Sequence, residues 1–82
     1  GFHITFDNGY TVSIQFGAGN YCDNYNSRDY SPKEGMQSST AEIAYWKKDS
    51  AMIEFEDSND TVKGYQTVKD VMEFLNQVMQ KE

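Results

Sequence analysis

Apolar and polar residues alternate strictly along the first part of the chain, with one interruption. The alternation runs over residues 2–7 and returns over residues 10–16. A period of two is typical of a strand with one buried face. Between the two runs lie Asn8 and Gly9, the preferred pair for a two-residue type I′ turn, in which both residues take positive φ. The pattern predicts a β-hairpin over residues 2–16.

A second pair of alternating segments follows a long polar stretch. Residues 40–48 alternate apolar and polar side chains, and residues 51–56 repeat the pattern. The polar run at 47–50 (Lys-Lys-Asp-Ser) has the composition of a turn. We therefore expect a second hairpin over residues 40–56, followed by a short strand or an irregular lead-in over residues 61–65.

The last part of the chain changes to a helical period. Thr67 and Asp70 form a weak variant of the capping box, with Asp in place of the usual Glu or Gln. The apolar residues behind it share one stripe, with Phe74 at its margin, and are Val68, Val71, Met72, Leu75, Val78 and Met79. We predict a helix over residues 67–81 on one face of an antiparallel sheet of four or five strands. This is an α+β fold in a single domain over residues 1–82.

The polar segment of residues 17–39 is the most unusual part of the chain. Loops beyond about 12–15 residues are uncommon in compact domains and are usually functional or disordered. The segment carries Tyr21, Tyr25 and Tyr30 among Asn, Asp, Ser and Gly, a mixture typical of surfaces that bind partners by adaptable contacts. We therefore take these three tyrosines as candidate partner-binding residues.

The densest charge cluster of the chain is acidic and consists of Glu54, Glu56, Asp57 and Asp60. The spacing from Asp57 resembles the opening of a calcium loop, but valines occupy the sixth and twelfth positions, where Gly and Glu are required. An EF-hand is therefore excluded. The cluster is either a solvated strand end or an acidic patch for a basic partner.

Trp46 is a further candidate for partner contact. It falls on the more polar face of its predicted strand, and Met52 and His3 are candidates for the same side. On an open sheet face Trp46 would be a binding anchor. If both faces of the sheet are covered, Trp46 belongs to the core.

Catalytic chemistry has little support in the sequence. His3 is the sole histidine, and Asp7 on the same strand face lies roughly 13 Å away, beyond hydrogen-bond reach. Cys22 is the only cysteine, and its neighbour Asp23 would not stabilise a thiolate. We interpret Cys22 as an anchor of the loop, and we expect a protein that is not an enzyme and holds no metal and no cofactor.

A small-ligand site is the alternative interpretation of the long loop. Gly17, Gly19 and Asn20 could present backbone N–H groups to an anion, with Tyr21 beside them, as for a nucleotide signal. The segment lacks the Lys and Ser/Thr of a P-loop, and no helical pattern follows it. A tight exit from the second strand explains the glycines more simply.

The charge and the cysteine content limit the classes of partner and the cellular compartment that the sequence supports. The chain has 82 residues and a net charge of −6, which argues against direct binding of nucleic acid or an anionic membrane. No apolar run approaches the ~20 residues needed to cross a bilayer. The lone cysteine favours a reducing intracellular compartment. A second copy of the chain is also a candidate partner, because exposed sheet edges pair readily and a short chain gains stability from association.

The segments FHITFDNGYTVSIQFG (2–17) and GNYC (19–22), with AEIAYW (41–46) and VKGY (62–65), resemble small accessory proteins of bacteriophages and prophages. The resemblance implies a phage-encoded context and a location in the cytoplasm of the host bacterial cell. Small acidic proteins in that context often act as anti-defence factors, such as anti-CRISPR proteins.

The resulting hypothesis is a non-enzymatic inhibitor of a host defence protein, CRISPR–Cas-like, or of a host regulatory protein. It would act by steric and electrostatic occlusion. The carboxylates of residues 54–60 would engage Lys and Arg side chains that otherwise contact nucleic acid, and the tyrosines would supply the anchors.

Overall fold

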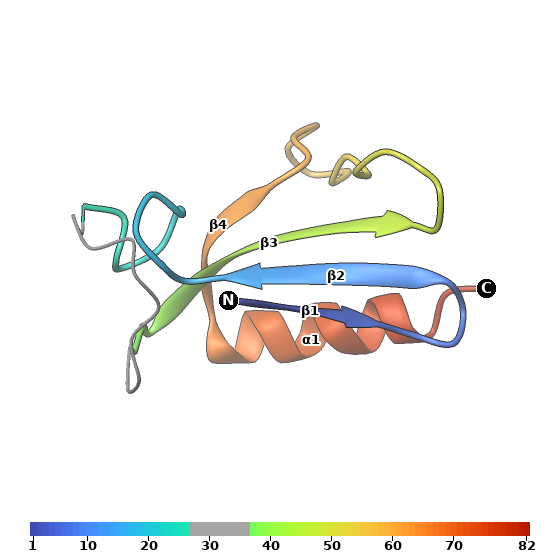
Figure 1. The fold of residues 1–82 in the computed structure, drawn as a ribbon, viewed down its shortest axis with the longest axis horizontal. Coiled ribbons are helices and arrows are strands. Elements are labelled where there is room, and N and C mark those ends of the chain that lie inside the picture. The colour runs from blue at the N-terminus through green and yellow to red at the C-terminus, as the bar shows by residue number, and fades with distance from the viewer. Residues whose placement is uncertain (27–36) are drawn as a thin grey trace.

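The protein folds as a four-stranded antiparallel sheet with one helix packed across one face (Figure 1). This computed structural model describes residues 1–26 and 37–82. The strands are adjacent in chain order, β1-β2-β3-β4, and the helix α1 follows them. The bounds are β1 Phe2–Thr5, β2 Tyr10–Gln15, β3 Thr40–Lys47, β4 Lys63–Thr67 and α1 Val68–Met79. The predicted α+β class is confirmed, with four strands.

The first hairpin forms as predicted, but its turn is different. Gly9 takes a positive φ of 88°, whereas Asn8 does not. The Gly9 N–H donates to the Phe6 carbonyl at 3.0 Å, and the Phe6 N–H donates to the Tyr10 carbonyl at 2.8 Å. These bonds close a three-residue loop with a left-handed glycine at its end. The predicted type I′ turn is therefore wrong.

The side chain of Asn8 accounts for the change of turn. Its Nδ2 donates to the carbonyl oxygens of Val78 at 2.9 Å, Met79 at 3.2 Å and Lys81 at 2.9 Å. Its Oδ1 accepts the Tyr10 N–H at 3.1 Å. The last carbonyls of a helix have no partner within the helix. Asn8 therefore satisfies the end of α1 and ties it to the β1–β2 turn.

The start of α1 is fixed by the capping box that the sequence predicts. The Thr67 side chain accepts the Asp70 N–H at 3.2 Å, and Asp70 Oδ2 accepts the Thr67 N–H at 3.0 Å. Hydrogen bonding from Thr67, first of all from its backbone N–H, lowers the pKa of the Asp70 carboxyl. Because Thr67 is also the last residue of β4, the helix must begin at the end of that strand. The helix is two residues shorter at its end than predicted.

The core lies between α1 and one face of the central strands. It is formed by Val12, Ile14, Ala41, Ile43, Val71, Phe74 and Val78. Phe74, which the sequence places at the margin of the helix stripe, is buried, whereas Val68, Met72 and Met79 are exposed. The Phe74 ring lies 5.6 Å from Tyr45 and 5.8 Å from Phe55. This aromatic cluster sets the rotation of the helix.

The segment of residues 51–56 differs from the prediction of a second strand. Met52 makes one isolated bridge to Trp46, and the Ile53 N–H donates to the Tyr45 carbonyl at 2.9 Å. The Phe55 N–H then donates to the Asp60 carbonyl at 2.8 Å, so the chain closes its own turn. The predicted turn at residues 47–50 forms and brings Met52 and Ile53 beside the end of β3, but residues 51–56 do not form a strand. The strand β4 pairs with the first half of β3 instead.

We predict that Asn8→Ala lowers the free energy of unfolding by about 1–3 kcal/mol, because several carbonyls at the end of α1 lose their partner. Asn8→Asp should be at least as destabilising, since it sets a carboxylate against the negative end of the helix. Thermal unfolding followed by circular dichroism measures both.

The matched control for Asn8 is Asn76→Ala, which changes an exposed helical Asn bonded to Gln80. We expect this change to alter the free energy of unfolding by no more than about 0.5 kcal/mol. Equal melting temperatures for Asn8→Ala and Asn76→Ala would contradict the role given to Asn8.

Candidate functional site

The face of the sheet opposite α1 carries the described part of the long polar loop. Glu42 alternates with the core residues Ala41 and Ile43 and so belongs to this face. Its Oε2 accepts the Tyr21 N–H at 2.8 Å, which brings the loop onto that side. In Figure 1 the loop after β2 lies at one end of the sheet, away from the helix.

Tyr21 is joined to β4 through a bulge in that strand. The pairing of β3 with β4 shifts register between Ala41 and Ile43, and Tyr65 takes a positive φ of 54°. The Tyr65 N–H donates to the Tyr21 carbonyl at 2.8 Å. A Cβ atom on Gly64 would come within 2.5 Å of Tyr21 Cβ, so this close approach requires glycine.

Two tyrosine rings stack at the surface of this loop, and the exposed Tyr65 is bonded to one of them through the backbone. The rings of Tyr21 and Tyr25 are stacked, with centroids 5.4 Å apart and planes 8° from parallel. Tyr21 is 47% exposed, Tyr25 41% and Tyr65 56%. We call these three residues the tyrosine surface. The predicted candidates Tyr21 and Tyr25 are thus brought together, and Tyr30 lies outside the described residues.

The base of the loop is held by polar side chains. The Asp23 carboxylate accepts the Ser39 N–H at 2.9 Å, the Thr40 hydroxyl at 2.7 Å and the Ser39 hydroxyl. These hydrogen bonds, that of the Ser39 hydroxyl first, lower the pKa of the Asp23 carboxyl. Asn24 Nδ2 donates to the carbonyls of Phe16 at 2.7 Å and Gln37 at 3.0 Å. Hydrogen bonds to β3 and to the end of β2 therefore fix residues 21–25.

The glycine segment before the tyrosines uses its own N–H groups. The Gly17 N–H donates to Asn20 Oδ1 at 3.0 Å, the Asn20 N–H to the Gly17 carbonyl at 3.2 Å, and the Gly19 N–H to the Tyr25 carbonyl at 3.2 Å. Cys22 is buried below this turn, with its Sγ 3.7 Å from the Gly17 carbonyl oxygen. In this conformation those three N–H groups are not directed at a ligand.

Trp46 lies on the same face of the sheet, farther along β3. Its ring meets the ring of His3 edge to face, with centroids 5.2 Å apart, and Met52 bridges to it. Trp46 is half-buried and is not part of the core. Four residues of strand separate it from Glu42, about 13 Å. The predicted grouping of Trp46, His3 and Met52 is confirmed.

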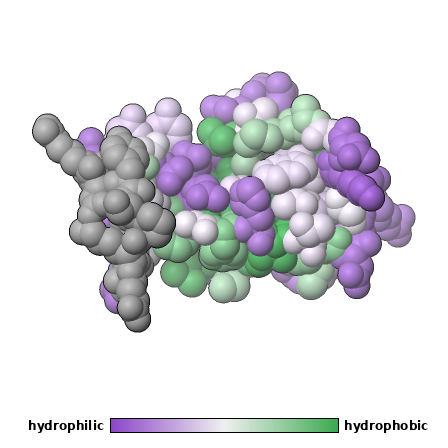
Figure 2. Space-filling view, viewed as in Figure 1, coloured by the Kyte–Doolittle hydropathy of each residue, from purple (hydrophilic) through white to green (hydrophobic). Residues whose placement is uncertain are grey.

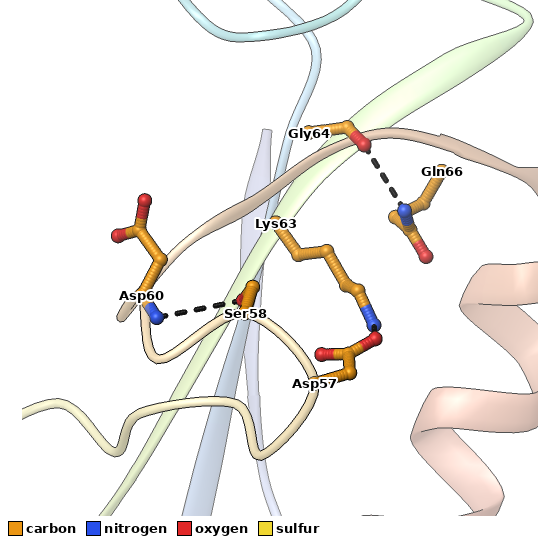
Figure 3. Close-up of polar contacts among 6 residues, drawn as sticks. All are labelled: Asp57, Ser58, Asp60, Lys63, Gly64 and Gln66. Carbon is orange, nitrogen blue, oxygen red and sulfur yellow. Dashed lines mark hydrogen bonds and ion pairs between the residues drawn. The ribbon is translucent and has the colours of Figure 1, made fainter.

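The acidic residues 54–60 lie on the connection before β4. Asp57 pairs with Lys63, and that contact lowers the pKa of the Asp57 carboxyl. The Asp60 N–H donates to Ser58 Oγ at 3.4 Å (Figure 3). Glu54 and Glu56 are exposed. Asp57 and Asp60 therefore stabilise the turn, and the two glutamates form the outward part of the cluster.

Two features were not predicted, one on this surface and one on the helix side of the sheet. Tyr65 joins the tyrosine surface through a backbone bond to a residue far away in the sequence. A signal for it exists, because a glycine within a strand, here Gly64, often marks a bulge or a close backbone approach. The apolar groove beside Phe2 and Met72 was also missed, since the predicted stripe placed Met72 inside.

Within residues 1–26 and 37–82, no three His, Cys, Asp or Glu side chains gather closely enough to hold a metal ion. The one helix of this part of the chain is too short to cross a membrane. Comparison with known proteins finds no matching family model, and no curated protein or solved structure of significant similarity. Function must therefore be argued from the surface itself.

We predict that the Asp23 carboxyl titrates below its ordinary pKa of 3.8. A folded-state pKa below the unfolded one means that this contact contributes stability above the unfolded pKa and loses it as the pH falls through the folded value. An NMR titration that follows the Asp23 carboxyl and the Ser39 amide measures the folded-state pKa. The chemical shift of the Ser39 amide should change with pH at the same midpoint, and this change should be absent in Asp23→Asn. A midpoint at or above the ordinary value would contradict the hydrogen bonding described for the loop.

Proposed function

We propose that this protein is a non-enzymatic binding protein that contacts a protein partner through the tyrosine surface. The observation that carries the proposal is the half-exposed, stacked pair Tyr21 and Tyr25. The Tyr21 backbone is fixed by hydrogen bonds to Glu42 and Tyr65, and the Tyr25 backbone by bonds within the loop. Tyrosine offers a large amphipathic contact area, and fixing it before binding reduces the entropy lost on association. Such residues commonly carry a large share of binding energy.

The charge of the protein favours a basic partner. The net charge is −6, and Glu54 and Glu56 face outward just before β4, whose middle residue is Tyr65. A standard interface buries about 800 Å² per partner, and in this proposal one partner contacts both the tyrosine surface and the two glutamates. Their charge would act mainly on the association rate and on partner choice.

More specifically, the proposed binding protein is a phage-encoded inhibitor of a host defence or regulatory protein, and it acts in the cytoplasm of the host cell. The resemblance to small phage accessory proteins and the acidic surface support it. The mechanism is occlusion, in which the glutamates meet Lys and Arg side chains that otherwise contact nucleic acid. The nucleotide-binding alternative has less support, because the Gly17, Gly19 and Asn20 N–H groups donate within the loop.

We predict that Tyr21→Ser with Tyr25→Ser weakens capture of the partner by about tenfold or more, since two anchors are lost together. The measurement is affinity capture from a bacterial lysate, followed by titration of the captured protein. Met79→Ser, an exposed apolar residue on the helix, is the matched control and should bind like the parent. Equal binding by the tyrosine double variant would refute the tyrosine surface.

The proposed inhibition of a host defence protein is tested separately, by the plating efficiency of a phage on bacteria that carry a defence system. Expression of the chain should restore plating, and expression of the tyrosine double variant should not. If the chain binds a protein but restores plating on no defence-equipped strain, the binding function stands and the inhibitor part is wrong.

We predict that Glu54→Lys with Glu56→Lys slows association with the partner and flattens its dependence on salt, because steering by these charges is lost. Asp57 is left unchanged, since it pairs with Lys63. Glu73→Lys with Glu82→Lys produces the same net charge, from −6 to −2, at sites on and after the helix. Stopped-flow association rates at low and high salt compare the two. Identical rates for both pairs would show that only the total charge matters.

A further inference from the structure

The strand β1 presents an open hydrogen-bonding edge. Within the described residues it pairs only with β2. The Phe6 N–H donates to the Tyr10 carbonyl, so the alternate pairs Ile4–Val12 and Phe2–Ile14 are the hydrogen-bonded ones. The backbone N–H and C=O groups of His3 and Thr5 therefore point away from β2. The hydroxyl contact between Thr5 and Thr11, at 2.9 Å, fits a closely spaced pair without backbone bonds.

The helix leaves the apolar side of β1 only partly covered: Ile4 and Phe6 pack against the edge of the core, whereas Phe2 is exposed. It packs against β2, β3 and β4 and makes no comparable contact with β1. A groove of about 420 Å³ opens beside the start of α1, and both Phe2 and Met72 line it. A second groove brings Met79 beside Phe6 at the other end. Phe2 is 46% exposed and Met72 60%. Figure 2 shows apolar surface along this lower side of the molecule.

We propose that a second copy of this chain docks on this edge by antiparallel pairing of the two β1 strands. A two-fold axis at Ile4 sets His3 opposite Thr5 of the partner subunit, so that the outward backbone groups bond to one another. Phe2 then lies opposite Phe6 of the partner subunit. The result is a continuous eight-stranded sheet with both helices on one face and the apolar side chains of both β1 strands between them.

The sequence of β1 favours a second copy over a foreign peptide. Residues 2–6 alternate apolar and polar side chains, so the strand of a second copy supplies both an extended backbone for the open edge and apolar side chains for the groove. These residues include no Lys, Arg, Asp or Glu, so no like charges oppose each other along the paired strands. They also lack the Pro and Lys that natural proteins use to block pairing at an exposed edge. The tyrosine surface has no part in this contact.

The first test is the mass of the protein in solution. Sedimentation should give twice the 9.4 kDa chain mass, or 18.8 kDa, at about 100 µM and a smaller average mass on dilution. Amide hydrogen exchange should show protection at His3 and Thr5 that falls on dilution, with the Phe6 amide as the internal control. A mass of one chain up to about 1 mM, or a dimer with unprotected His3 and Thr5, would overturn the proposal.

Two variants locate the contact. Thr5→Pro removes an outward N–H at an edge, where proline is tolerated, and Phe2→Lys sets a charge in the apolar contact. Both should give a single-chain mass, whereas Met52→Lys, an exposed apolar site on the other side of the sheet, should stay dimeric. If Thr5→Pro does not fold, Phe2→Lys decides. A folded Phe2→Lys variant that is still dimeric would refute pairing with a second copy. So would a monomeric parent protein whose β1 amides become protected only when an extended peptide is added.

Discussion

One helix cannot cover four strands, and most of this structure follows from that limit. Four strands span about 14 Å between their outer axes, whereas a helix with side chains is about 10 Å across. α1 starts at Thr67, the end of β4, and its last carbonyls are held by Asn8 at the β1–β2 turn. The helix therefore lies over β2, β3 and β4, and the apolar side of β1 is only partly covered.

The other face of the sheet is shaped by a single bulge. Because β4 departs from the β3 ladder at Gly64 and Tyr65, one N–H becomes available to the Tyr21 carbonyl. Glu42 and Thr40 then hold the loop from the β3 side, through Tyr21 and Asp23. The core and the tyrosine surface thus use opposite faces of the same strands, so a change in the tyrosines need not disturb the packing under the helix. This separation makes the surface suited to binding.

Most of the fold could be predicted from local sequence patterns, whereas the remaining features depend on contacts between residues far apart in the chain. Strict alternation and the Thr67 cap are read from neighbouring residues, so the hairpin and the helix start were predictable. The turn at Asn8 was not, because its side chain bonds to residues 70 positions away. Phe74 was placed at the margin because its partners Tyr45 and Phe55 come from separate segments. In the candidate site, Tyr21 and Tyr25 followed from composition, whereas Tyr65 depended on a bulge.

The central claim is that Tyr21 and Tyr25 form a surface fixed before any partner binds, although their segment has the composition of a flexible loop. Backbone ¹⁵N relaxation of the protein alone measures this directly on the picosecond-to-nanosecond timescale. The account predicts order parameters near about 0.85 at both tyrosines, equal to those of the strands. Values below about 0.6 would mean that the stacked pair does not persist in solution, and would contradict the account.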